Sequence, residues 1–230
     1  IIGLELGQVY ASLGSKVTVV EYLPSLVPGA DSDIIKPLQR KLNKQFEQIL
    51  LSSKVVSVSE IKQDQLSVQI EDKSGIKEQV FDKILISVGR TPNINNLKLE
   101  NTNVELNEAG FIKVNEYQKT TVNSIYAIGD IVGNPMLAHK ATYQGKIAAE
   151  VISGHPAVYD VKTVPSVVYT DPEVAWAGIT EKEAKENEIP YEKGEFPWAA
   201  SGKALILNAN QGKTKILFNP ENKQVIGVGI

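Results

Sequence analysis

The most constraining feature of the sequence is a helical apolar pattern followed at once by a β-branched strand, both within the first 21 residues. Apolar side chains recur with the i, i+3, i+4, i+7 spacing of one helical face: Leu6, Val9, Tyr10 and Leu13. Gly14 then provides a helix stop, and residues 16–21 read KVTVVE, which is typical of a strand covered on both faces of a parallel sheet. This order predicts a βαβ unit whose first strand lies upstream of Ile1, and hence an α/β fold.

The alternation of helices and strands continues downstream. A helix is expected over about 34–49, beginning close enough to Pro37 that the missing proline N–H falls in the first turn. Short strands are expected at 55–58 and 66–70. The continuous apolar run at 83–88 is typical of a buried central strand.

The middle of the sequence begins with the turn residues GRTPN at 89–93, and the polar stretch 93–107 after them is expected to be a linker. A strand is expected at 124–128. A helix is expected to run from 138 to Gly154, with small side chains along one stripe that imply close backbone approach.

The pattern of the last part of the sequence is typical of an antiparallel sheet. Strands are expected at 164–170, 173–178, 214–218 and 224–230. Thr180 and Glu183 have the spacing of a capping box, which predicts a short helix ending near Asn187. The architecture is therefore expected to be α/β, then a short mixed segment, then α+β.

Composition excludes several classes of protein. Apolar residues make up 42% and charged residues 22%, as in globular proteins, and the net charge of −3 with no basic cluster argues against nucleic-acid or anionic-membrane binding. No apolar run approaches the roughly 18 residues of a membrane span, so a soluble protein is expected. The sequence contains no cysteine, so thiol chemistry would have to come from outside it. Because it opens without Met and closes on an apolar run, we expect an internal piece of a longer protein.

Gly3 and Glu21 are the first candidate site residues. A helix that starts without bulky side chains can hold a pyrophosphate on its free N–H groups, and an acid at the end of the next strand can accept from ribose hydroxyls. The alternative is tight helix-to-strand packing with a surface glutamate. The two histidines, His139 and His155, are not grouped with acids at metal-ligand spacing, so no metal site is expected.

Four segments carry a resemblance to a known family. They are IIGLELGQVYASLGSKVTVVE at 1–21, ISVGRTPN at 86–93, SIYAIGDIVGNPMLAHKA at 124–141 and YTDPEVAWAGITEKEA at 169–184. In this order they resemble the dihydrolipoamide dehydrogenase branch of the pyridine nucleotide-disulfide oxidoreductase family. The resemblance implies a Rossmann-like NAD-binding domain over 1–93 that lacks its first strand, a central FAD-contacting segment over 94–160, and a C-terminally truncated dimerisation domain over 161–230.

The resemblance also implies residues for NAD. Gly3 resembles the third glycine of the GxGxxG motif, and Glu21 resembles the acid that binds the adenosine ribose. No arginine lies between Glu21 and Arg40 to hold a 2′-phosphate, which favours NAD over NADP. Val55 and Gly89 match positions that line the adenine and nicotinamide ends.

Other residues are matched to FAD. Asp130 resembles the aspartate that binds the ribityl chain, although an isolated Gly-Asp could equally form an Asx turn. The start of the following helix would lie beneath the isoalloxazine ring and place a positive helix pole there: Met136, Leu137, Ala138 and His139. Glu5 resembles the glutamate that pairs with a lysine beside flavin N5. Its alternative role is to complement the dipole of its own helix.

The activity implied by the resemblance is reoxidation of dihydrolipoamide to lipoamide, with electrons passing through an enzyme disulfide and FAD to NAD. The implied partners are a second copy in a homodimer and the lipoyl-bearing subunits of 2-oxoacid dehydrogenase complexes, in the cytoplasm or the mitochondrial matrix. Since the redox cysteines are absent from this sequence, the piece alone is expected to be inactive. Two alternatives remain: a related disulfide reductase or transhydrogenase, and a non-catalytic NAD-binding and dimerisation module.

Overall fold

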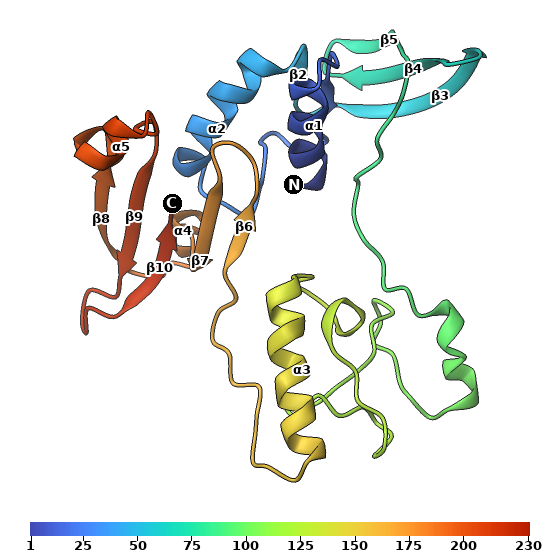
Figure 1. Ribbon diagram of the computed structural model, residues 1–230, viewed down its shortest axis with the longest axis vertical. Coiled ribbons are helices and arrows are strands. Elements are labelled where there is room, and N and C mark those ends of the chain that lie inside the picture. Colours follow the sequence, from blue (N-terminus) through green and yellow to red (C-terminus); the bar gives the residue numbers. More distant parts are fainter. The chain divides into compact units, whose positions relative to one another are not determined.

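The computed structural model describes residues 1–230, which form two compact units (Figure 1). The first unit combines residues 1–87 with 165–230, and the second comprises 88–164. The first unit is therefore made of the two ends of the sequence, and the middle segment forms the second unit. None of the helices is both long and apolar enough to cross a membrane.

The first unit opens with the expected alternation of helix and strand. Its elements are α1 (Ile2–Ser12), β1 (Thr18–Val20), α2 (Ser32–Gln45) and β2 (Gln48–Leu50), and β1 and β2 pair in parallel. Gly14 follows α1 with φ of +99°, a conformation that favours glycine, as its predicted role as a helix stop requires. The α/β class is thus confirmed, and the helix and strand at its start are confirmed as well.

The apolar stripe predicted along α1 does not face the core. Its four residues are all exposed, from 38% for Leu6 to 78% for Leu13, and Leu4, Gly7 and Gln8 are buried instead. Gly7 brings α1 close to α2, because a Cβ there would lie 3.2 Å from the Phe46 ring. The face of α1 that carries Gly7 therefore packs, and the predicted apolar stripe does not.

The second helix starts earlier and ends sooner than predicted. α2 begins at Ser32, so Pro37 lies inside it and not in its first turn. It ends at Gln45, because Phe46 is extended and Ile49 belongs to β2, which forms ladder hydrogen bonds with β1. The buried face of α2 is apolar, with Leu38 and Leu42 completely inaccessible to solvent.

A three-stranded antiparallel sheet follows, made of β3 (Lys54–Lys62), β4 (Gln65–Asp72) and β5 (Gly75–Phe81). The strands predicted at 55–58 and 66–70 are confirmed, and β5 was not anticipated. The buried central strand predicted at 83–88 is wrong. This run forms no strand because no neighbouring strand accepts its backbone hydrogen bonds, and its apolar side chains are exposed, Ile86 by 76%.

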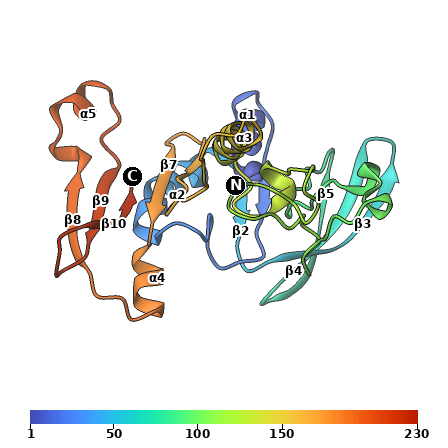
Figure 2. The ribbon, with the colours of Figure 1, turned by 90° about the horizontal axis from the view of Figure 1, so that it is seen from below.

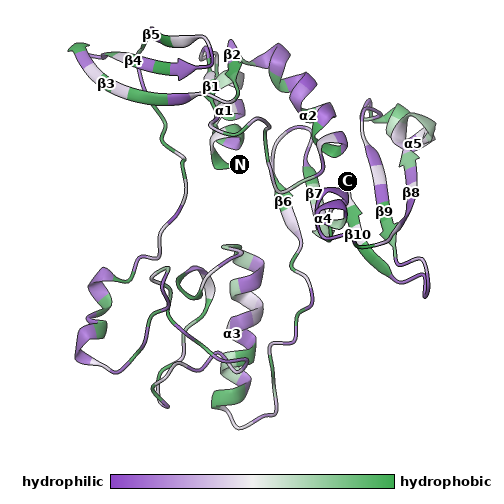
Figure 3. Cartoon of the chain, turned by 180° about the vertical axis from the view of Figure 1, so that it is seen from behind, coloured by the Kyte–Doolittle hydropathy of each residue, from purple (hydrophilic) through white to green (hydrophobic).

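The C-terminal part of the first unit is a five-stranded antiparallel sheet in the order β6-β7-β10-β9-β8, and Figure 2 shows β8, β9 and β10 side by side. The strands are β6 (Ser166–Val168), β7 (Val174–Gly178), β8 (Glu192–Pro197), β9 (Lys213–Phe218) and β10 (Val225–Gly229). Four of them confirm predicted strands, and β8 was missed. Figure 3 colours β10, which lies in the middle of the sheet, as hydrophobic.

Two short helices accompany this sheet. α4 (Glu181–Glu186) has the predicted capping box, in which the Thr180 hydroxyl accepts from the Glu183 N–H while the Glu183 carboxylate accepts from the Thr180 N–H. α5 (Gly202–Ile206) follows a 3-10 turn, η4 (Trp198–Ala200). Val168 and Val174 belong to the same hydrophobic core as α2, so the two ends of the sequence share one core.

The second unit is built around α3 (Ala138–Ile152), with short 3-10 turns η1 (Asn95–Leu97), η2 (Leu99–Asn101) and η3 (Gly129–Val132). α3 confirms the predicted helix, and its small residues do allow close approach, since a Cβ at Gly145 would lie 3.3 Å from Ile128. The strand predicted at 124–128 is reduced to one isolated bridge, Lys119 with Tyr126. The linker predicted at 93–107 is wrong, because this stretch forms η1 and η2 and contributes Val104 to a small core with Ile112 and Ala127.

Candidate functional site

The N-terminus of α1 has the properties of an anion-binding helix end. Ile1 precedes the helix and no side chain caps its first turn, so backbone N–H groups there are open to a ligand. Gly3 lies in that first turn. Its missing side chain matters, because a Cβ at this position would collide with the Ser87 hydroxyl. Gly3 thus leaves room for the Ser87 side chain beside α1.

Glu21 follows directly after β1, at the carboxyl end of the strand. Its backbone continues the strand pairing, with the N–H donating to Leu50 and the carbonyl accepting from Ser53. One side-chain oxygen, Oε1, accepts from the Leu23 N–H at 2.8 Å, which fixes the orientation of the carboxylate. The second oxygen is available to a hydroxyl group.

Val55 and Gly89, the other two residues matched to NAD, are placed differently. Val55 lies in β3 opposite Ile70 and is 47% exposed. Gly89 has φ of +140° and belongs to the second unit, whereas Gly3, Glu21 and Val55 belong to the first. The structure therefore brings three of the four residues into one unit.

Asp130 lies on the 3-10 turn η3, and its carboxylate forms an ion pair with Arg90 at 2.5 Å. α3 holds both ends of this turn. The Gln144 side chain accepts from the buried Gly129 N–H at 2.8 Å, which fixes the first end. Asp130 is consequently presented from a turn whose position depends on α3.

The other end of η3 is held by Lys140, one helical turn before Gln144 on α3. The Lys140 ammonium is buried and donates to the Gly133 carbonyl at 2.5 Å. Burial lowers the pKa of Lys140, while the negative charge of Asp130 opposes that effect. Lys140 thus lies close enough to Asp130 for the two charges to interact.

The start of α3 is a second uncapped helix end. Leu137 is its N-cap residue, makes no side-chain cap, and is followed by Ala138 and His139 in the first turn. Met136 lines an adjacent open hollow of about 510 Å³, together with Arg90 and Phe111. Asp130 and residues 136–139 therefore lie on η3, at the start of α3 or in the short loop between them, whereas Glu5 lies on α1.

Glu5 and Gln8 face the loop between β6 and β7. Glu5 Oε1 accepts from the Tyr169 N–H at 2.8 Å. The Gln8 amide makes two hydrogen bonds to the backbone of Asp171, accepting from its N–H at 2.8 Å and donating to its carbonyl at 3.0 Å. Two side chains of α1 thus hold a segment that is more than 160 residues away in sequence.

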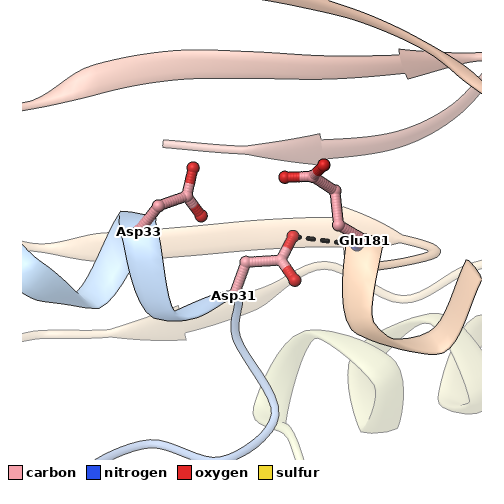
Figure 4. Close-up of side chains that lie close together, drawn as sticks. All are labelled: Asp31, Asp33 and Glu181. Atoms are coloured by element: carbon pink, nitrogen blue, oxygen red, sulfur yellow. Dashed lines mark hydrogen bonds between the residues drawn. The ribbon is translucent and has the colours of Figure 1, made fainter. Parts of the chain in front are cut away.

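Three acidic side chains converge between α2 and α4: Asp31, Asp33 and Glu181 (Figure 4). Such a group could hold a cation, and the chain provides one, because the Lys215 ammonium lies 2.7 to 2.9 Å from all three carboxylates. Only 2% of the Lys215 side chain is exposed. The group is therefore an ion-pair network.

Charges in this network shift one another's pKa values. Burial alone would raise the pKa of Asp33, but hydrogen bonds from Lys213 and Lys215 outweigh it and lower that pKa to about 2. Glu181 shows the same balance, with a net lowered pKa. For Lys215 burial would lower the pKa, and the three carboxylates raise it above its usual range. All these groups are held in their charged forms.

Sequence reasoning missed the residues that act over long range. Alternation along β9 places Lys215 on the same face as the buried Leu217. A lysine at an inward position of a strand could have indicated that acidic partners lie nearby. Nothing local to Gln8, Gln144 or Arg90 indicates their partners. Their roles depend on tertiary contacts.

Comparisons with known proteins agree with this architecture. The family model described as pyridine nucleotide-disulphide oxidoreductase matches residues 1–145, and the model for the dimerisation domain of the same family matches residues 164–230. A dihydrolipoyl dehydrogenase of Vibrio parahaemolyticus is 48% identical over the whole chain, and one of Haemophilus influenzae is 44% identical. The chain spans about half the length of these curated relatives, 48% of each.

Solved structures of other proteins also share this fold. The HOCl-induced flavoprotein disulfide reductase RclA from Escherichia coli superimposes with a TM-score of 0.87 at 27% identity, over 100% of this chain and 52% of that one. LpdA from Mycobacterium tuberculosis superimposes with a TM-score of 0.88 at 25% identity, over 99% of this chain and 49% of that one. With one family model covering residues 1–145 and its companion covering most of the rest, the chain belongs to the pyridine nucleotide-disulphide oxidoreductase family.

Proposed function

We propose that the chain is the NAD-binding and dimerisation part of an FAD-dependent dihydrolipoyl dehydrogenase, which oxidises dihydrolipoamide to lipoamide and reduces NAD. The observation that carries this proposal is the identity of 44% to 48% with proteins of that name over the full length of the chain. The uncapped start of α1, with Gly3 in its first turn and Glu21 after β1, supports a dinucleotide site.

In this proposal four residues serve NAD. The backbone at Gly3 receives the pyrophosphate, and the free oxygen of Glu21 accepts from the adenosine ribose hydroxyls. Val55 provides apolar surface for the adenine end, and Gly89 provides backbone at the nicotinamide end. The fit is supported by the start of α1, which no side chain caps, and at Glu21, whose carboxylate is already oriented.

Five residues serve FAD, which when bound supplies two-electron transfer between a disulfide and NAD. Asp130 accepts from a ribityl hydroxyl through its second oxygen while Arg90 keeps the first. The start of α3, which no side chain caps, would offer its positive pole to the flavin, and the four residues assigned there are Met136, Leu137, Ala138 and His139. Glu5 faces a lysine of the FAD-binding part, beside flavin N5. The segments that we assign are 1–93 for NAD, 94–160 for FAD and 161–230 for dimerisation.

The proposed enzyme would have two kinds of protein partner. A second copy would form a homodimer through the dimerisation segment, and lipoyl-bearing subunits of 2-oxoacid dehydrogenase complexes would supply the substrate. The match of residues 164–230 to a dimerisation-domain model supports the first of these.

The test is to purify the full-length protein, record its flavin spectrum and measure NAD reduction by dihydrolipoamide. We expect bound FAD and turnover with dihydrolipoamide. A protein that binds FAD and oxidises NADH with another disulfide or metal substrate, but not with lipoamide, would favour the second candidate, a related disulfide reductase. The similarity to RclA supports keeping that candidate. Absence of flavin and of NADH binding would refute both.

A further inference from the structure

Gln8 has an unusual environment for a glutamine on a helix. It lies on the packed face of α1 and is only 8% exposed. Its amide accepts from the Asp171 N–H at 2.8 Å and donates to the Asp171 carbonyl at 3.0 Å, so it bonds to both backbone groups of one residue. This pairing imitates one rung of a β-ladder.

A second glutamine completes the environment. The remaining amide hydrogen of Gln8 is donated to Gln45 Oε1 at 2.9 Å, and Gln45 in turn donates to the Ser12 hydroxyl at 3.1 Å. This network fixes the orientation of the Gln8 amide, because a flipped amide would place donors against donors. Only a planar side chain with both a donor and an acceptor meets these requirements.

The segment that Gln8 holds lies outside the sheet. Tyr169 to Asp171 lie between β6 and β7 and take part in no strand pairing. Thr170 is buried, at 4% exposed, and its hydroxyl donates to the Pro172 carbonyl, while the Asp171 carboxylate forms an ion pair with Lys41. The Lys41 pair is exposed, at 41% and 80% of the two side chains, and contributes little.

The same segment orients Glu5. Glu5 lies one helical turn before Gln8 on α1, and its Oε1 accepts from the Tyr169 N–H at 2.8 Å. Tyr169 is two residues from Asp171, so moving Asp171 away from α1 would also move the donor that fixes the Glu5 carboxylate. With one oxygen of Glu5 held, the other is presented in a defined direction.

We propose that Gln8 is a positioning residue for Glu5: by holding the backbone of residues 169–171 against α1, its amide fixes the direction in which the Glu5 carboxylate is presented. This inference rests on the proposed function, in which Glu5 faces a lysine beside the flavin. Glu5 is the residue that contacts the reacting region, and Gln8 acts through it.

The experiment uses the full-length enzyme with Gln8→Met, which keeps the volume and removes the hydrogen bonds. We expect the rate constant for flavin reduction by NADH to fall about tenfold, because a small misplacement of a positioning contact is costly. Amide hydrogen exchange in residues 169–171 should become faster. Lys41→Met is the matched control, since it removes the exposed contact to Asp171 and should change neither quantity. If Gln8→Met folds poorly, Gln8→Asn gives the same comparison, because its amide is one methylene shorter and cannot reach both backbone groups.

A double-mutant comparison separates positioning from a general structural effect. In a Glu5→Gln background, Gln8→Met should cause little further loss of the flavin reduction rate, whereas its effect on the thermal midpoint should persist. An equal loss of rate in both backgrounds would overturn the inference, as would an unchanged rate despite faster exchange at 169–171. Failure of the proposed function would be recognised separately, because the unmodified enzyme would then lack flavin or would not be reduced by NADH.

Discussion

Lys215 and Asp33 form an ion pair of 2.8 Å although 182 residues of sequence separate them. The Lys215 ammonium also contacts Asp31 at 2.7 Å and Glu181 at 2.9 Å. The network therefore joins the start of α2 to β9 and α4, which belong to the regions matched by two different family models. These charges reinforce the apolar core that the two regions share.

Replacing Lys215 by methionine should strongly destabilise the protein. The substitution keeps the length of the side chain but leaves three carboxylates close together without their central cation. Breaking a buried ion pair by removing one partner typically costs about 3–5 kcal/mol. Chemical denaturation should therefore give a free energy of unfolding lower by about that amount.

Lys223→Met is the matched control for that experiment. Lys223 pairs with Glu192, and both side chains are more than half exposed, at 61% and 55%. Exposed pairs of this kind contribute little, so the control should behave like the unmodified protein. If both substitutions lowered stability equally, burial of Lys215 would not be the reason.

The same network predicts a dependence of stability on pH. The pKa of Asp33 is lowered from 3.8 to about 2 by its lysine partners, so the carboxylate stabilises the folded state at pH values above about 4. This contribution is lost as the pH falls from about 4 to 2 and Asp33 becomes protonated. Asp33→Asn should be less stable than the unmodified protein at pH 7, with the difference shrinking towards pH 2, as denaturation curves over this range would measure. A difference independent of pH would contradict the assignment.

Local patterns predicted the elements that depend on local interactions. The capping box of Thr180 and Glu183 is satisfied within four residues, and it forms as expected. α1 and α3 also follow from spacing and helix stops. Elements that need a distant partner were less predictable. Residues 83–88 have the composition of a central strand but no strand beside them. Ile49 was expected in a helix but lies in β2, which pairs with β1.

The candidate site shows the same division. The positions of Glu21 after a strand and of Asp130 after a glycine could be inferred from neighbouring residues. Their partners could not, because the bonds that orient the turn of Asp130 come from Gln144 and Lys140 on a later helix. Side chains such as Gln8 show no sequence signal, since any polar residue on α1 could equally have faced solvent.

Gln144→Leu should weaken FAD binding by the full-length enzyme. The substitution removes the acceptor for the buried Gly129 N–H and so releases one end of the turn that carries Asp130. Leaving a buried N–H unpaired costs about 1–3 kcal/mol, which corresponds to roughly a 5- to 150-fold rise in the FAD dissociation constant if the turn must be ordered to bind. Titration of the apoprotein with FAD measures this dissociation constant.

Two further variants on α3 serve as controls for that titration. Gln144→Glu keeps an acceptor for the Gly129 N–H and should retain most of the affinity. Lys146→Met changes an exposed residue of the same helix and should have no effect. Equal affinity of Gln144→Leu and Lys146→Met would show that the turn does not depend on this hydrogen bond.

Glu21→Arg should shift the preference of the enzyme from NAD toward NADP. In the structure one oxygen of Glu21 is held by the Leu23 N–H, and the other is free to accept from ribose hydroxyls. An arginine removes that acceptor and offers a cation to a 2′-phosphate, so the ratio of the NADH and NADPH dissociation constants should change by about tenfold or more. Glu21→Gln separates the two effects, because its amide can still bind a hydroxyl and the Leu23 N–H but carries no charge. It should weaken NADH binding without admitting NADPH, whereas equal selectivity of all three proteins would place the adenosine ribose away from Glu21.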